Sequence, residues 1–281
     1  MSDLTIFSIN NAIQFNQPIF ILGAFESFHI GHYFLLEQAL KIKQEDQDIV
    51  LVYFKDVDKL PKNKNQKIFM DLKSRIQTFA NLNFKYAIEL VYEEIKNLDA
   101  NDFLNKLFEN QEDFQIITGK DFCFGKDKKG NVELLSNTYP DRVFSFELMK
   151  LENKIKISTS YLKENLELGN IDFNNKLLIE PYQISAILHK DLTLDIDDLV
   201  LKVPEGIYAS SLIIKDYEYK VVLLNDGQKY RVKFLDFNYK GKNDLQQAYL
   251  LIEKEIRFFA NNENKEISKN DVFEVKKHYF E

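Results

Sequence analysis

The stretch that decides the fold of this chain reads Phe20-Ile21-Leu22-Gly23-Ala24-Phe25-Glu26-Ser27-Phe28-His29-Ile30-Gly31-His32. The apolar run from Pro18 to Leu22 has the length of a buried parallel strand. From Gly31 the pattern becomes helical, with apolar side chains spaced for one buried face at Phe34, Leu35, Leu36, Ala39, Leu40 and Ile42. The sequence therefore predicts a strand, a short turn and a helix in direct succession.

The turn between this strand and helix has the features of a phosphate-binding site. Gly23 lets the backbone approach a phosphate closely, and the helix start offers unpaired N–H groups and the positive end of its dipole. His29 and His32 lie near that start and can donate hydrogen bonds to the same anion. An ordinary turn with two polar side chains is the alternative. Two of the four histidines and two of the nine glycines gather here, which argues against chance.

The turn resembles the G-x-F-x-x-x-H-x-G-H signature of nucleotidylyltransferases that use two histidines. Such enzymes transfer a nucleotide monophosphate to a phosphate acceptor and release pyrophosphate. The resemblance implies that His29 and His32 are catalytic and stabilise charge on the α-phosphate and the leaving group. It implies nucleotide-binding roles for Gly23, Ala24, Phe25 and Gly31.

Composition excludes several classes of function. A net charge of -7 argues against a general nucleic-acid or anionic-membrane surface, so we expect neither partner. The single cysteine, Cys123, rules out an internal disulfide and suits a reducing cytoplasm. We find no Cys and His cluster for a metal, no secretory signal pattern in residues 1–16 and no apolar segment of the ~20 residues that a membrane helix needs. The sequence thus predicts a soluble cytoplasmic protein and leaves its oligomeric state open.

Strands and helices alternate through the first half of the chain. Strands are predicted at 48–54, 87–92 and 114–118, and helices at 71–82, with Asp71 as N-cap, and at 101–110. This alternation predicts an α/β fold with a parallel sheet and helices on both faces. Ligands of such sheets bind at the carboxyl ends of the strands, where both the histidine turn and the segment after Gly119 fall. The lysine-rich segment Lys62–Lys67 is interpreted as a solvated loop.

A second informative segment runs from Gly119 to Gly130. Alone, it reads equally well as a glycine-punctuated loop with a basic tip. Together with the histidine turn it resembles the prokaryotic bifunctional riboflavin kinase/FAD synthetases, which carry G-x-D/N-F-x-F-G-x-x-R-x-G here, with Lys128 in place of the family's Arg. The resemblance implies flavin-binding roles for Asp121, Phe122, Phe124, Gly125 and Lys128.

A third segment, Lys154–Lys163, contains three hydroxyl side chains before a predicted helix at 161–168 that ends at Gly169. These hydroxyls can cap that helix. The family has I-S-S-T-x-I-R at this place, where hydroxyls and a helix N-terminus hold the ATP phosphates. The resemblance, which spans roughly residues 15–182, implies a catalytic role for Lys156 and nucleotide-binding roles for Ser158, Thr159, Ser160 and Lys163.

From Gln183 onward the chain is β-rich. Strands are predicted at 199–203, 206–214, 217–224 and 228–237, and a helix at 246–259. The order resembles the family's riboflavin kinase module, a small β-barrel; Pro204–Ala209 matches its P-x-G-V-Y-A strand and Phe234–Phe237 its L-L-D-F. We therefore expect two domains: a Rossmann-like nucleotidylyltransferase domain at 1–182, and a riboflavin-kinase-like domain at 183–281.

The kinase chemistry of that module is missing from this sequence. The family's glycine-rich loop and G-x-P-T-A-N motif are replaced by His189–Asp198, which has four aspartates and no glycine. Arg231 aligns with the family's general base, a Glu, and a guanidinium cannot accept a proton. We therefore predict that the second domain has no riboflavin kinase activity.

The resemblance implies an FMN adenylyltransferase, or FAD synthetase. In this reaction the phosphate of FMN attacks the α-phosphorus of ATP, pyrophosphate leaves with Mg²⁺, and FAD is the product. Glu26 and Ser27 stand where the family has Asp and Gly. Two alternatives remain: another adenylyl- or cytidylyltransferase with a different acceptor, and a non-enzymatic flavin- or nucleotide-binding module.

Overall fold

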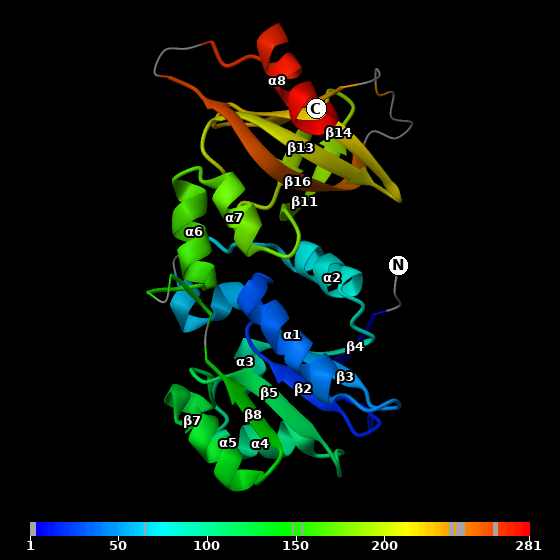
Figure 1. Cartoon of the computed structure of the whole chain (residues 1–281), viewed down its shortest axis with the longest axis vertical. Helices are drawn as coiled ribbons and strands as arrows, with labels where there is room; N and C mark the ends of the chain where they lie inside the picture. Colours follow the sequence, from blue (N-terminus) through cyan, green and yellow to red (C-terminus); the bar gives the residue numbers. More distant parts are fainter. Residues whose placement is uncertain are drawn as a thin grey trace. The chain divides into compact units, whose positions relative to one another are not determined.

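The computed structural model of this chain describes residues 4–64, 66–147, 149–152, 154–235, 239, 245–260 and 264–281 (Figure 1). The chain forms two compact units. The first contains Met1–Gln66 and Arg75–Ser158, and the second contains Lys67–Ser74 and Thr159–Glu281. The functional division predicted at residue 183 stays a prediction. Asn65 of the lysine-rich segment, and Asp236 and Phe237 of the matched L-L-D-F, lie outside the described residues.

The first unit is built on a six-stranded parallel sheet. Its strands are β1 (Thr5–Ser8), β2 (Ile19–Leu22), β3 (Ile49–Phe54), β4 (Tyr86–Leu90), β5 (Gln115–Gly119) and β8 (Val143–Phe146), in the spatial order β1-β4-β3-β2-β5-β8. All five neighbouring pairs are parallel. This confirms the predicted α/β class with a parallel sheet.

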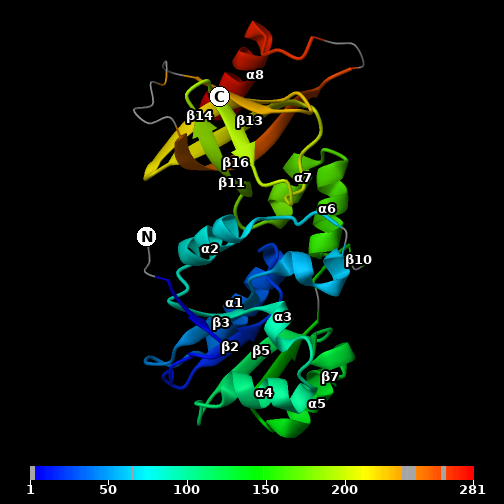
Figure 2. The ribbon, with the colours of Figure 1, turned by 180° about the vertical axis from the view of Figure 1, so that it is seen from behind.

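Helices connect these strands and cover both faces of the sheet. They are α1 (Ile30–Ile42), α2 (Leu72–Asn81), α3 (Tyr92–Ile95), α4 (Ala100–Phe108) and α5 (Val132–Thr138). Figure 1 shows α1 in front of the sheet, and Figure 2, seen from behind, shows α4 in front. Asp99 caps α4 by accepting a hydrogen bond from the Asp102 N–H, and Asn131 caps α5 in the same way. Side chains from α4 and from β2, β3 and β5 share one apolar core.

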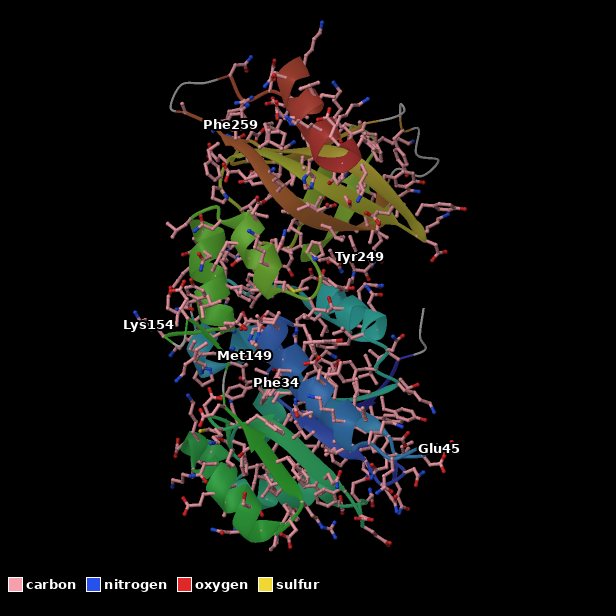
Figure 3. The ribbon with its side chains drawn as sticks, viewed as in Figure 1. Phe34, Glu45, Met149, Lys154, Tyr249 and Phe259 are labelled. Carbon is pink, nitrogen blue, oxygen red and sulfur yellow. The ribbon has the colours of Figure 1, made fainter. Side chains whose placement is uncertain are left out.

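The buried strand and the helix predicted around the histidine turn are both present. All four residues of β2 are buried, as its apolar sequence predicts. On α1, Leu35, Leu36 and Ala39 are buried, and Phe34 packs edge-on against Phe146 with 5.6 Å between ring centroids (Figure 3). Leu40 is 54% exposed, so the predicted apolar face was too wide at this residue.

Short elements line the loops of the first unit. They are η1 (Val57–Lys59), η2 (Pro61–Asn63), β6 (Cys123–Phe124), η3 (Lys126–Lys128), β7 (Gly130–Asn131), β9 (Lys150–Leu151) and β10 (Ile155–Lys156). β6 pairs with β7, and β9 pairs with β10, each antiparallel. These two hairpins carry parts of the second and third informative segments of the sequence.

The second unit contains a closed barrel, as predicted. Its strands are β11 (Tyr182–His189), β12 (Thr193–Ile196), β13 (Gly206–Ile214), β14 (Tyr217–Asn225), β15 (Tyr230–Phe234) and β16 (Leu245–Phe258), in the order β11-β12-β15-β14-β13-β16. Its helices are α6 (Thr159–Glu167), α7 (Ile171–Leu177) and α8 (Lys269–Phe280). The predicted strand at 206–214 coincides with β13.

Two predictions in this unit were wrong. The predicted helix at 246–259 is strand β16, which pairs with both β11 and β13. Its residues Ala248, Leu250 and Ile252 are buried in alternation, a period that belongs to a strand. The predicted strand at 199–203 forms only a single bridge, between Val200 and Ile68, and Pro204 follows it.

Candidate active site in the histidine turn

His29 is the N-cap of helix α1, directly before its first residue, Ile30. Its backbone is extended (φ -101°, ψ 171°), and its Nδ1 accepts a hydrogen bond from the His32 backbone N–H at 3.3 Å. An imidazole that accepts at Nδ1 carries its proton on Nε2 when neutral. The cap therefore leaves the Nε2–H of His29 as the ring's donor.

The rings of His29 and His32 stack on each other, with 3.8 Å between centroids and 14° between planes. Burial, together with the positive charges of Lys62 and Lys156, lowers the pKa of His29 from 6.5 to about 4. Burial and the neighbouring His29 lower the pKa of His32 well below 6.5. Both imidazoles are thus neutral near pH 7, so the turn presents N–H dipoles and not two positive charges.

Phe25 has an unusual backbone conformation. Its φ is 47°, in the left-handed region that non-glycine residues seldom adopt. The ring of Phe25 lies 4.8 Å from that of His32 and covers Gly23. A Cβ on Gly23 would come within 2.8 Å of the Phe25 ring, and a Cβ on Gly31 within 3.1 Å of the His29 ring. The two glycines therefore make room for aromatic rings.

Glu26 joins the turn to the lysine-rich loop. Its carboxylate is buried, accepts a hydrogen bond from Asn63 Nδ2 at 2.7 Å and lies 3.2 Å from Lys62 Nζ. Sequence reasoning missed this role of Lys62, because the loop was interpreted as solvated surface. The signal was Glu26 itself, since a carboxylate in an otherwise apolar, buried turn needs a cation or donors. Ser27, in contrast to Phe25, has no positive φ, so the serine brings no backbone strain.

Lys156 lies on β10 and pairs with Asp121, at 2.5 Å between Nζ and Oδ2, with both side chains about half exposed. Its positive charge acts on His29. The first unit therefore brings together three predicted catalytic residues, His29, His32 and Lys156, with the predicted flavin residue Asp121.

The other predicted flavin residues lie in the loop around β6. Phe124 is buried in the core against Phe103, with 5.6 Å between ring centroids. Phe122 is only partly buried and stacks on Phe124. Gly125 has a φ of 71°, which favours glycine, and Lys128 is exposed. Of the two phenylalanines, only Phe122 has surface left for a ligand; the flavin roles stay predictions.

The predicted phosphate-binding hydroxyls lie at the end of the first unit and the start of the second. Helix α6 begins at Thr159, two residues earlier than predicted, and Gly169, with a φ of 80°, follows it as predicted. Thr159 and Lys163 are buried, Ser160 is exposed and Ser158 is partly buried. Their role in binding nucleotide stays a prediction.

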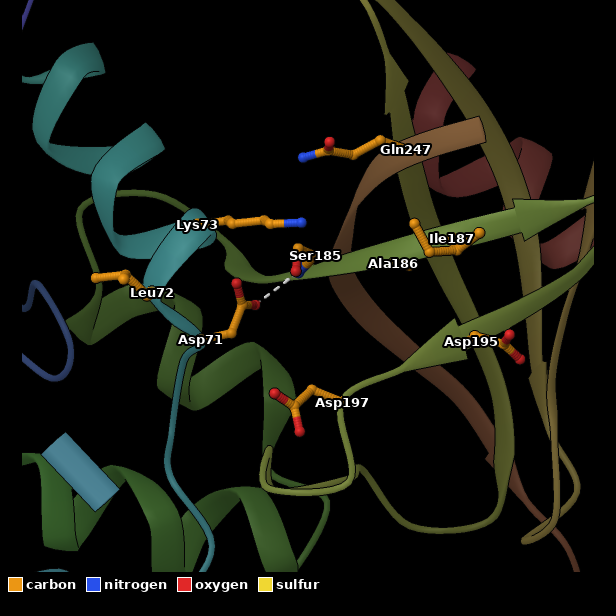
Figure 4. A pocket seen from close by; sticks show the side chains of 9 residues that line it. All are labelled: Asp71, Leu72, Lys73, Ser185, Ala186, Ile187, Asp195, Asp197 and Gln247. Carbon is orange, nitrogen blue, oxygen red and sulfur yellow. Dashed lines mark hydrogen bonds between the residues drawn. The ribbon is translucent and has the colours of Figure 1, made fainter. Parts of the chain in front are cut away.

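A pocket of about 360 Å³ lies within the second unit (Figure 4). Asp71, Asp195 and Asp197 bring three carboxylates to its lining, beside Lys73. Asp71 is the N-cap of α2, as predicted, and also accepts a hydrogen bond from the Ser185 N–H at 2.7 Å. This lining would repel a polyphosphate.

Two further observations cover only the part of the chain that the structure describes. No group of three or more His, Cys, Asp or Glu side chains there could hold a metal ion. No helix there is long and apolar enough to cross a membrane.

A family model described as FAD synthetase matches residues 13–161, just over half of the sequence. A bifunctional riboflavin kinase/FMN adenylyltransferase of Buchnera aphidicola is 24% identical over 262 residues, covering 86% of this chain and 82% of that protein. An FAD synthetase of Listeria monocytogenes is 25% identical over 192 residues, covering 65% of this chain and 77% of that protein.

Among solved structures, a protein named as a macrolide-efflux protein of Streptococcus pneumoniae has the same fold. Its TM-score is 0.78 at 20% identity, and the match covers 99% of this chain and 97% of that chain. At this identity the likeness shows the fold alone. The family resemblance inferred from the three motifs is confirmed by the family match: the chain belongs to the FAD synthetase family.

Proposed function

We propose that this chain transfers AMP from ATP to FMN at the histidine turn, giving FAD and pyrophosphate, and that its second domain does not phosphorylate riboflavin. The observation that carries the first part is the pair of stacked imidazoles at the N-terminus of α1, with two lysines nearby. A helix start with such donors binds phosphate groups. The family supplies the acceptor, FMN.

The transfer needs positioning and charge stabilisation from the protein, and no covalent intermediate. A phosphate oxygen of FMN attacks the α-phosphorus of ATP in line, and the bond from the α-phosphorus to the bridging oxygen of pyrophosphate breaks. In our proposal, neutral His29 and His32 donate N–H groups to the oxygens on which negative charge grows. Lys62 and Lys156 supply the positive charge, and Mg²⁺ enters as part of the substrate, bound to ATP.

The ion pair of Lys156 with Asp121 bears on how ATP would bind. Without substrate, the ammonium of Lys156 contacts a carboxylate while its side chain stays about half exposed. When a polyphosphate arrives, its oxygens compete with Asp121 for the ammonium. In our proposal Lys156 exchanges one anionic partner for another on binding ATP.

Three features of the second unit support the absence of kinase activity. Arg231, at the position of the family's general base, pairs with Asp226 at 2.6 Å. In the segment that replaces the glycine-rich loop, Asp195 pairs with His189 at 2.7 Å. Asp195 and Asp197 also line the pocket described above, where no glycine cradle for phosphate is present.

The test follows FAD formation by HPLC from FMN and from riboflavin, each with ATP and Mg²⁺. FAD from FMN alone supports both parts of the proposal, and any FMN or FAD from riboflavin contradicts the second part. Flavin binding without release of pyrophosphate would instead favour a binding module. Turnover with another phosphorylated acceptor, or with CTP, would favour a different nucleotidylyltransferase. A cytoplasmic location is part of the proposal, supported by the single cysteine.

A further inference from the structure

Arg75 on helix α2 is one of the largest fully buried side chains of the protein, at 1% exposure. Its guanidinium donates hydrogen bonds to backbone carbonyls of two loops. Nε donates to Phe25 O at 2.7 Å and Nη2 to Ala24 O at 3.3 Å, both in the histidine turn. Nη2 also donates to Phe54 O at 2.5 Å and Nη1 to Lys55 O at 3.3 Å, both at the end of β3.

The guanidinium thus joins the carboxyl ends of two adjacent strands, β2 and β3, which are neighbours in the sheet. The rigid, planar fork of arginine suits this task, because its five donors point in fixed directions. A lysine ammonium offers three donors from one point and cannot span both loops. Arg75 also lies against the ring of Tyr53, at 5.5 Å from its centroid.

Contacts continue from Arg75 to the histidines. Phe25, whose carbonyl Arg75 binds, has the positive φ that turns its ring toward His32. The Phe25 ring also packs on Phe28, at 5.7 Å, and the ring of His32 stacks on that of His29. A strained backbone conformation persists only where surrounding contacts hold it. The hydrogen bond at the Phe25 carbonyl is such a contact.

We propose that Arg75 is a positioning residue of this site: by holding the histidine turn against the end of β3, it sets where His29 and His32 lie. This inference rests on the proposed function for its effect on catalysis. Arg75 touches no substrate in this scheme and acts only through the turn. Its loss should displace the imidazoles, and misplacement of catalytic groups by about 1 Å can cost about 10²-fold in rate.

The experiment compares Arg75→Lys and Arg75→Ala with a matched control, Arg142→Lys. Arg142 also donates to a carbonyl, Glu112 O at 2.9 Å, and lies over an aromatic ring, Phe114, but far along the chain from the histidine turn. Each folded variant is assayed for kcat and KM for ATP in FAD synthesis, below its melting temperature. Arg75→Ala is also assayed with dilute guanidinium ion, which can enter the space of the missing side chain.

We expect Arg75→Lys and Arg75→Ala to lose about 10- to 100-fold in kcat, with KM for ATP changed less than about threefold. Guanidinium should restore about tenfold or more to Arg75→Ala, and Arg142→Lys should keep the wild-type kcat. Folded Arg75→Lys with wild-type kcat would overturn the proposal. So would failure of both variants to fold, because Arg75 would then serve the fold as a whole.

A second readout does not depend on catalysis. The protein has four histidines, of which His29 and His32 lie in the first unit and His189 and His278 in the second. Imidazole NMR signals of ligand-free Arg75→Lys should shift for His29 and His32 and stay in place for the other two. Unchanged signals would overturn the positioning role. If wild-type protein makes no FAD, the proposed function fails, and the NMR comparison still decides whether Arg75 positions the histidines.

Discussion

The ring of His29 lies flat against that of His32, and its Nδ1 accepts the backbone N–H of His32. His29 therefore both caps helix α1 and contacts the ring of His32. Because the cap occupies Nδ1 of His29, only Nε2–H can serve a ligand. The two histidines thus act as one unit, and changing either ring should disturb the other.

Replacing either histidine should therefore cost more than one hydrogen bond. We expect His29→Ala and His32→Ala each to lower kcat by about 10²-fold or more, because donors to a developing charge are removed and the stack is broken. Steady-state kinetics on protein shown by circular dichroism to be folded checks this. His189→Ala, which changes a partly exposed histidine of the second unit, is the matched control. An effect of only a few-fold in the first two variants would mean that these histidines are not catalytic.

The lowered pKa of His29 predicts how stability depends on pH. The unfolded chain protonates this histidine near pH 6.5, whereas the folded protein resists protonation until about pH 4. The unfolded state therefore binds more protons in this interval, and the free energy of unfolding falls as pH falls from 6.5 to 4, by at most about 1.4 kcal/mol per pH unit for this group. Urea unfolding of the wild type and of His29→Gln, at several pH values between 6.5 and 4, measures this dependence of the free energy of unfolding on pH. An equal dependence in the two proteins would contradict the lowered pKa of His29.

Gly31→Ala should lower the activity of the protein without lowering its stability. Alanine favours a helix over glycine by up to about 1 kcal/mol, and Gly31 has no positive φ, so the helix should not weaken. The new Cβ would lie 3.1 Å from the His29 ring and displace it by a few tenths of an ångström. We expect kcat to fall about tenfold while the melting temperature stays level or rises. Glu37→Ala on the exposed face of α1 controls for helix propensity, and a fall in both properties would point to a general packing fault instead.

Lys62 should contribute to ATP binding, although it lies in a lysine-rich loop. Lys62→Ala removes a cation held beside the histidines by buried Glu26. We expect KM for ATP to rise about tenfold, since one charged contact to phosphate is worth about 1.5–3 kcal/mol. Lys64→Ala, an exposed neighbour, should leave KM unchanged. Equal effects of the two substitutions would show that the loop acts only through its total charge.

Local pattern was enough to predict the elements that depend on near neighbours in the chain. The buried run before Gly23, the helix after it, the Asp71 cap and the parallel sheet were all predicted correctly. Strand β16 was mispredicted because its residues have good helix-forming side chains, and pairing with β11 and β13 on both sides overrode that preference. Such pairing joins residues distant in sequence, so no local period reveals it.

The sequence by itself determined the chemistry of this protein: two histidines and two glycines at the end of a buried strand, followed by the family's two later motifs. Only the tertiary structure decided what supports them. Arg75 and Lys62 lie 46 and 33 residues beyond His29 in the chain, and neither belongs to a motif. Their importance arises because the ends of β2 and β3 meet at one edge of the sheet, where a buried carboxylate and buried loop carbonyls require partners from elsewhere in the chain.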